Sequence, residues 1–321
     1  MCIFDCNTIH IINMYMKQTT FKELSQMWSD MKRPLVKHST MCAYRLIIRH
    51  YLLPYFGTAT EISEGDVQQF IISQTEKGLA RKTIRDIVAT LKAVVKFGAG
   101  KKLFRRDEWM LTYPSDASER HLQTLSMSQQ RKLMRHLTEN PSHKNVGILI
   151  AICTGMRIGE VCALQWKDVD LIQRVITVRR TVGRVYNSDM RATEKVFSKP
   201  KTQNSFREIP VSKPLHAVLR ELKRASDTPF VVGRAETSTE PRAYRDYFYR
   251  LLQRLGIPHI VFHGLRHTFA TRCIESHCDY KTVSAILGHS NVSTTLNLYV
   301  HPNIDQKKRC IQKMNKFVGM D

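Results

Sequence analysis

The sequence predicts a mainly α-helical protein with a small β-sheet (α+β), built as two domains. Apolar residues recur at helical spacing over most of the chain, and three short stretches favour strands, at about 174–182, 194–199 and 206–211. At 321 residues the chain exceeds the usual size of one domain, which is roughly 100–200 residues. With 42% hydrophobic and 24% charged residues, the composition is that of a globular protein and not of a disordered one.

The first domain is expected at residues 19–104, as four helices with a basic surface, after an N-terminal extension at 1–18 that we expect to be poorly ordered. Ser63 and Asp66 form a start that resembles a capping box, and Gly78 ends the same helix. The helix that follows carries its apolar residues on one face, which predicts packing against the other helices: Ile84, Ile87, Val88, Leu91, Val94 and Val95.

A linker is predicted at residues 105–119, which hold Pro114 and show no clear periodicity. The second domain is expected at 120–321, with its first helix beginning near Ser126. Turn residues 201–205 separate the last two predicted strands, and helices dominate again from Lys213 onwards. The tail from Asp305 to Phe317 is predicted as a basic helix.

The charge of the chain favours a polyanionic partner. Fifty Lys and Arg residues against 28 Asp and Glu residues leave a net charge of +22, and the pI is about 9.8. Contacts between such side chains and phosphates release condensed counterions, so nucleic acid is the partner that this composition favours.

Metal, membrane and secretion signals are weak. None of the eight cysteines forms a Cys-x-x-Cys pair, and although Cys273 and Cys278 flank His277, scattered thiols in a reducing cytosol are the favoured interpretation. No apolar run reaches the roughly 18 residues that a membrane span needs. Residues 1–16 lack a charged n-region and a cleavage site of small residues. We therefore expect a cytoplasmic protein without a metal or cofactor.

Two segments place arginine where it can meet an anion. Arg157, in Thr154-Gly-Met-Arg-Ile-Gly-Glu160, follows a glycine break and opens a helix, so its side chain is expected near helix N-terminal amides. His263 and Arg266 are three residues apart and share one helical face, which pairs a phosphate ligand with a group able to transfer protons. The neighbouring His267 faces elsewhere and is interpreted as a hydrogen-bonded core histidine.

The third segment is Leu287-Gly-His289-Ser290, followed ten residues later by Tyr299. Gly288 ends one helix and puts His289 at a bend, where its side chain can face a cleft. The chain has 11 tyrosines, and the spacing around Tyr299 does not by itself make it a nucleophile.

Taken in order, these segments, together with Pro200-Lys201-Thr202 and His263-Gly-Leu-Arg-His-Thr-Phe-Ala-Thr271, resemble the catalytic domain of tyrosine recombinases, the phage integrase family. These motifs are most similar to those of integrases from conjugative transposons and temperate phages. The resemblance covers about residues 20–300, although the helical part matches by size and character only. It implies a site-specific enzyme that cuts and rejoins DNA strands to integrate or excise a mobile element.

The resemblance implies a role for each matching residue. Arg157 and Arg266 would grip the scissile phosphate and stabilise the charge of its pentacoordinate state. Tyr299 would attack phosphorus, which leaves a 3′-phosphotyrosyl link and a free 5′ hydroxyl. Lys201, on the expected hairpin tip, would protonate the leaving 5′ oxygen.

Three further residues complete the implied site. His263 would assist proton transfer near the nucleophile, and His289 would donate to the phosphate or position Tyr299. Glu160, one helical turn from Arg157, would support that arginine. Because the covalent link conserves the phosphodiester energy, and cationic side chains supply the positive charge, no Mg²⁺, ATP or other cofactor is expected.

The basic helical domain would form the other half of a clamp on double-stranded DNA. Its predicted contacts, which bind phosphates and therefore carry no direct base information, are Arg81, Lys82, Arg85, Lys92 and Lys96. In the family, four protomers act on two duplexes through a C-terminal helix, a role that the basic helix from Asp305 would fill unless it is a solvated tail. A DNA-bending or excision accessory protein and association with the bacterial nucleoid are also expected.

Three alternatives stay open from the sequence. A type IB topoisomerase uses the same arginine, lysine, histidine and tyrosine chemistry, but the motifs around His263 and His289 resemble those of recombinases. A regulator derived from an integrase would bind DNA without cutting it, and a plain helix-turn-helix regulator would not need this basic set. Many integrases of this kind also carry an N-terminal domain that binds arm sites, and residues 1–18 are too short for it.

Overall fold

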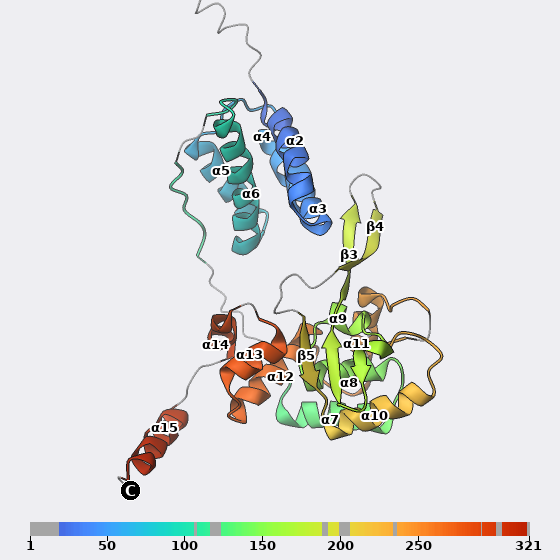
Figure 1. Cartoon of the computed structure of the whole chain (residues 1–321). Helices are drawn as coiled ribbons and strands as arrows, with labels where there is room; N and C mark the ends of the chain where they lie inside the picture. Colours follow the sequence, from blue (N-terminus) through green and yellow to red (C-terminus); the bar gives the residue numbers. More distant parts are fainter. Residues whose placement is uncertain are drawn as a thin grey trace, which may run out of the picture. The chain divides into compact units, whose positions relative to one another are not determined.

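The computed structural model describes residues 19–105, 108–115, 123–187, 192–198, 206–233, 236–289, 291–299 and 304–319. The predicted N-terminal extension, 1–18, lies outside these residues. The chain divides into two compact units (Figure 1). Unit 1 comprises the chain up to Glu119 together with Val185–Glu194, and unit 2 comprises the rest.

Unit 1 is a bundle of helices around an aromatic and aliphatic core. Two of its helices begin at capping boxes, in which Thr20 bonds with Glu23 and Ser63 bonds with Asp66, as the sequence predicts for Ser63. The main helices are α2 (Phe21–Lys32), α3 (His38–Ile47), α5 (Glu64–Glu76) and α6 (Arg81–Gly100), with a 3-10 turn at Arg33–Leu35.

Helix α3 continues through a π-helical turn at Ile48–Leu52 into the short α4, Leu53–Phe56. Pro54 explains this widened turn, because proline has no N–H with which to make the usual bond to the fourth residue before it. Ile48, Leu52 and Phe56 still point into the core and meet the buried face of α6.

Residues 108–115, which belong to the predicted linker, lie extended along α5 and α6. Glu64 accepts from the Met110 amide at 2.6 Å, and Gln68 exchanges two hydrogen bonds with the backbone of Thr112, at 3.0 and 3.1 Å. Glu64 and Gln68 are about one helical turn apart, and Met110 and Thr112 are two extended residues apart. These two distances are similar, so the side chains of α5 can bond with alternate residues of the segment. Trp109, Leu111 and Tyr113 pack against the core of unit 1.

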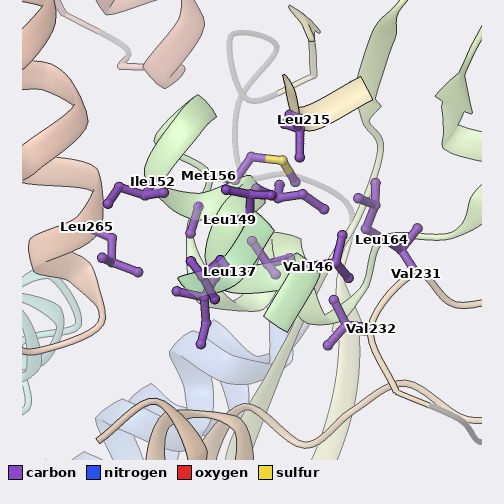
Figure 2. Close-up of a cluster of buried hydrophobic side chains, with 14 of the residues drawn as sticks. Leu137, Val146, Leu149, Ile152, Met156, Leu164, Leu215, Val231, Val232 and Leu265 are labelled. Carbon is purple, nitrogen blue, oxygen red and sulfur yellow. The ribbon is translucent and has the colours of Figure 1, made fainter. Parts of the chain in front are cut away.

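Unit 2 is built around α8 (Asn145–Thr154), a helix whose residues are buried on nearly all sides. Its side chains interdigitate with those of the surrounding helices and loops, including Leu137, Leu215, Val231 and Leu265 (Figure 2). The other helices of the unit are α7 (Met127–Glu139), α9 (Ile158–Cys162), a 3-10 turn (Trp166–Asp168), α10 (Lys213–Arg224), α11 (Pro241–Arg254), α12 (His263–Glu275), α13 (Tyr280–Leu287), α14 (Val292–Tyr299) and α15 (Ile304–Phe317).

The strands form two small sheets. Strands β1 (Val169–Asp170), β2 (Val175–Val178) and β5 (Arg207–Pro210) form an antiparallel sheet in the order β1-β2-β5, and β3 (Thr181–Asn187) pairs with β4 (Ala192–Ser198). The mainly helical fold with a small β-sheet is therefore confirmed.

The expected pairing of the last two strands is wrong. The stretch before Lys201 becomes β4, which pairs with β3, whereas the stretch after it becomes β5, which pairs with β2. Burial explains the difference. Ile209 and Arg207 alternate onto the buried face of β5 beside Ile176 and Val178, whereas β4 has only half-buried and exposed residues. The described strands on either side of Lys201 thus belong to different sheets and do not form the expected hairpin with each other.

The predicted strand at 174–182 is two strands, because Arg179 and Arg180 interrupt it and both reach the buried carboxylate of Asp168. Across the described ranges, no helix combines the length and the apolar character that a bilayer crossing requires.

Candidate active site

Arg157 lies at the junction between α8 and α9, where the backbone is fixed tightly. Helix α8 ends at Gly155, whose left-handed φ of 68° suits glycine, and a Cβ there would come within 2.6 Å of Leu287. Arg157 is then extended and caps α9, and its side chain is 38% exposed. The junction therefore holds the arginine in place and leaves its guanidinium accessible.

The backbone amide of Arg157 is already bound within the protein. Helix α9 is only five residues long, and the Arg157 amide donates to Glu160 Oε2 at 2.9 Å. Because a carboxylate already occupies this amide, it is the arginine side chain that can meet an anion. Glu160 Oε1 also accepts from Arg157 Nη1 at 3.0 Å, so the two residues form a closed pair.

Glu160 is shared with a second arginine. The guanidinium of Arg207, at the start of β5, donates to both carboxylate oxygens, at 3.2 and 2.9 Å, and both side chains are buried. Burial alone would raise the pKa of Glu160, but bonds and charges of Arg207 and Arg157 outweigh it and lower the pKa below its usual value. Glu160 is therefore an anion between two cations.

Helix α12 brings Arg266 and His263 to the same place. Arg266 is only 2% exposed, and its Nη1 donates to the carbonyl of Gly155 at 2.9 Å. The ring of His263, one turn earlier, meets that of His267 edge to face, with centroids 4.7 Å apart. His267 is half-buried and not in the core as expected, and its ring contact places it next to His263.

His289 follows the end of α13, where Gly288 adopts a left-handed φ of 67°. Its Nδ1 lies 2.8 Å from the hydroxyl of Thr295, a fully buried residue of α14. Tyr299 is the last residue of α14 and comes one helical turn after Thr295. The side chain of Tyr299 lies outside the described part of the structure.

The two histidines share one electrostatic environment. The protein packed around His289 lowers its pKa to about 4, and the charges of Arg266, Arg157, His263 and Arg207 add to this effect. Partial desolvation lowers the pKa of His263 to about 4 as well, helped by His267, Arg266 and Arg157 and opposed by Glu160. These residues therefore form one cationic cluster, in which both histidines are neutral at pH 7.

Lys201 lies outside the described residues. Its neighbour Lys195 is described, and its Nζ donates to the carbonyl of Ser238 at 3.0 Å beside the ring of Phe197. Lys195 is therefore engaged in holding β4. In the described ranges no group of three His, Cys, Asp or Glu residues could hold a metal ion.

Sequence reasoning missed two residues of this cluster, Arg207 and Thr295. Arg207 falls in a predicted strand at the position that alternates with buried Ile209, which is an unusual place for an arginine. Thr295 precedes Tyr299 by four residues and therefore shares its helical face. The sequence therefore marks both positions as unusual, although it does not show that they contact this cluster.

The basic residues predicted to contact DNA from unit 1 lie on α6, where two of them stack on the extended segment 108–115. Arg85 lies over the ring of Tyr113 at 5.1 Å, and Lys92 lies over that of Trp109 at 5.9 Å. Lys82 and Lys96 are exposed, and Arg81 is half-buried.

Comparison with known proteins identifies the family. Residues 123–306 match the phage integrase family, and residues 20–72 match the N-terminal SAM-like domain of phage integrases. A XerC-like tyrosine recombinase of Caldanaerobacter subterraneus is 26% identical over 95% of this chain and 85% of its own length. The ICEBs1 integrase of Bacillus subtilis is 23% identical over 84% of this chain and 76% of its own length.

Solved structures share the fold. The Tn1549 transposon integrase in complex with transposon right end DNA has a TM-score of 0.74, at 24% identity over 92% of this chain and 99% of that one. A lambda integrase tetramer bound to a Holliday junction has a TM-score of 0.65, at 16% identity over 94% of this chain and 84% of that one. The chain belongs to the phage integrase family and is a site-specific DNA recombinase of the tyrosine type.

Proposed function

We propose that this recombinase cuts each DNA strand by attack of Tyr299 on a backbone phosphate, and that it integrates or excises a mobile element. The observation that carries the proposal is the contact between His289 and α14. It ties the helix that ends at Tyr299 to His289, whose pKa is lowered by burial and further by the charges of Arg266 and Arg157. A nucleophile on this helix would thus work beside a cluster suited to a phosphate.

Two arginines would bind the scissile phosphate. Arg157 is accessible, whereas Arg266 is buried and oriented by its bond to Gly155. The guanidinium of Arg157 would therefore reach the phosphate from the solvent side, and that of Arg266 from the protein interior. Each planar guanidinium keeps its charge at any working pH and can bind two non-bridging oxygens. Both would stabilise the additional negative charge of the pentacoordinate state.

The histidines would handle hydrogen bonds and protons. With Nδ1 of His289 engaged by Thr295, its Nε2 is the nitrogen that would donate to a phosphate oxygen. Neutral His263 would accept the proton of the Tyr299 hydroxyl as the new bond between oxygen and phosphorus forms.

The bond from phosphorus to the 5′ oxygen breaks in the same step, and Lys201 would supply the proton that the leaving oxygen takes up. A 3′-phosphotyrosyl link and a 5′ hydroxyl result. Attack by a 5′ hydroxyl of another strand reverses the step and restores Tyr299. The cationic side chains would provide the charge that Mg²⁺ provides in other phosphoryl transfers, so the reaction needs no metal.

Unit 1 would strengthen binding to duplex DNA through contacts between its basic side chains and the backbone phosphates. The residues proposed for these contacts are those of α6: Arg81, Lys82, Arg85, Lys92 and Lys96. Support comes from the net charge of +22 and from the exposure of Lys82 and Lys96. The structures that share this fold include integrases bound to DNA.

Self-association into a tetramer on two duplexes is also proposed. Helix α15 displays apolar side chains at roughly heptad spacing, and Ile304, Ile311 and Met314 are exposed, as is Phe317 at 90%. This face would dock on a neighbouring protomer on DNA. The lambda integrase is known as a tetramer on a Holliday junction. An accessory DNA-bending or excision protein, and a cytoplasmic location at the bacterial nucleoid, complete the proposal.

A suicide substrate tests the reaction. Nicked duplexes tiled across the DNA on either side of the gene are incubated with the wild-type protein and with Tyr299→Phe, in EDTA. The proposal predicts a covalent protein–DNA adduct with wild type only. An adduct that forms only when Mg²⁺ is restored would contradict the metal-free mechanism. Binding without any adduct would indicate a DNA-binding regulator.

A further inference from the structure

We propose that Arg207 is a positioning residue that fixes Arg157 and His289 in place relative to each other. The inference rests on the proposed function, because it concerns the same phosphate site. Arg207 itself is buried within unit 2, so it would act through its neighbours and not by touching DNA.

The geometry of Arg207 joins two parts of the site that come from distant segments. Its two terminal nitrogens bind the carboxylate of Glu160, which holds both the amide and the side chain of Arg157. Its Nε donates at 2.6 Å to the carbonyl of Ile286, three residues before His289. One planar group thus connects the start of α9 with the end of α13.

The bond to Ile286 has a local purpose. The last carbonyls of a helix have no partner within it, and α13 ends at Leu287. Arg207 satisfies one of them from β5, immediately before the left-handed Gly288 that turns the chain to His289. The orientation of that turn therefore depends on the guanidinium.

The shared carboxylate has a consequence for Arg157. Glu160 divides its charge between Arg207 and Arg157, and the guanidinium of Arg157 is still accessible. Without Arg207, Glu160 would be paired with Arg157 alone and would hold it more strongly, away from a phosphate. Arg207 would therefore keep Arg157 available for DNA as well as correctly placed.

Net stabilisation explains this arrangement less well than positioning does. Burying an arginine and a carboxylate costs desolvation that their attraction often only offsets, so apolar residues would serve the fold as well. A second buried carboxylate, Asp168, provides a comparison in the same unit, because it binds Arg180 and Arg179 beside β2. Arg180 also bonds with Gln165, and none of these residues is among the groups that shift the pKa of His289 or His263.

The test compares Arg207→Lys with Arg180→Lys. Lysine keeps the charge but lacks the fork, so it cannot bind Glu160 and Ile286 together. We expect Arg207→Lys to bind the nicked duplex with the wild-type Kd. It should form the covalent adduct about ten to a hundred times more slowly, because small displacements of catalytic groups cost rates of this size. Arg180→Lys should lose stability and still form the adduct at the wild-type rate.

A second readout reports position without catalysis. The groups that face His289 are Arg266 and His263 from α12, Arg157 from the start of α9, and Arg207 from β5. NMR titration of the His289 ring in Arg207→Met should show a higher pKa than in wild type, since one cation is removed and a neighbour is displaced. The same titration in Arg180→Lys should match wild type.

The outcomes separate the two proposals. Slow cleavage by Arg207→Lys with an unchanged Kd supports positioning, whereas wild-type cleavage or an equal loss in Arg180→Lys overturns it. If the wild-type protein forms no adduct, the proposed function fails, and the titration of His289 alone then decides whether Arg207 orders the cluster. If the Arg207 variants do not fold, Glu160→Gln, which weakens the same link, must slow cleavage without changing Kd.

Discussion

Nδ1 of His289 lies 2.8 Å from the hydroxyl of Thr295, which is four residues before Tyr299 on the same helix. This bond joins the loop after α13 to the interior of α14. A change at Thr295 should therefore affect both His289 and Tyr299, the nucleophile that we propose.

Thr295→Val tests the bond, because valine matches threonine in shape and lacks only the hydroxyl. Loss of one such bond is worth about 0.5–1.5 kcal/mol, so we expect cleavage to slow by roughly three- to tenfold and stability to fall by a similar free energy. Single-turnover adduct formation and urea unfolding measure the two effects. Thr295→Ser, which keeps the hydroxyl, should restore the rate; a slow serine variant would assign the effect to packing.

The low pKa values of His263 and His289 predict how stability depends on pH. In the unfolded chain both rings titrate near 6.5, and in the folded protein near 4. Between these values the unfolded state binds more protons, so stability should rise as pH increases from about 4 to 6.5 and then level off for these groups. Melting temperatures across this range, with NMR titration of each ring, provide the measurement. Folded-state midpoints near 6.5 would contradict it.

Gly155→Ala should destabilise unit 2. Alanine at a φ of 68° costs about 1 kcal/mol, and its Cβ would lie 2.6 Å from Leu287 and 2.8 Å from Phe269, where crowding adds roughly 1–3 kcal/mol. Gly100→Ala is the matched control, since nothing lies within 4 Å of a Cβ in that helical position. The control should be neutral or slightly stabilising by denaturant unfolding. Equal losses at both sites would refute the packing argument.

The salt dependence of DNA binding should separate two residues of α6. Both side chains are exposed, but Arg85 also stacks on the ring of Tyr113 within unit 1. Each phosphate contact contributes about 0.9 to the slope of log K against log salt concentration. Lys82→Ala should reduce this slope by about that amount, and Arg85→Ala should reduce it less while lowering stability. A larger change from Arg85→Ala would mean that its stacking on Tyr113 does not withhold it from DNA.

Local signals in the sequence were sufficient for much of the fold. The pairing of Ser63 with Asp66 and the left-handed Gly78 set the limits of α5 as predicted, because caps and glycines act through neighbouring residues. The pairing of β5 with β2 could not be predicted from local signals, because the turn residues predicted at 201–205 suggested a hairpin of β4 with β5. Only the burial of Ile209 against β2 favours the pairing that the structure shows.

The candidate site shows the same division. Arg157, His263, Arg266 and His289 are found together, as their motifs predict, whereas Arg207 joins them through contacts with residues 47 and 79 positions away. Such contacts exist only once α9, α13 and β5 have packed. The alternation of Trp109, Leu111 and Tyr113 could have revealed that part of the predicted linker packs on unit 1, but the surrounding polar residues concealed it.

The central claim is that Tyr299 is the nucleophile, and mapping the trapped adduct tests it most directly. The wild-type protein is bound covalently to a nicked duplex in EDTA, digested with protease and nuclease, and analysed by mass spectrometry. We predict that the nucleotide remains attached through its 3′ phosphate to the peptide that holds Tyr299. A nucleotide on any other residue, such as the exposed Tyr280, or a link through a 5′ phosphate, would contradict the proposal.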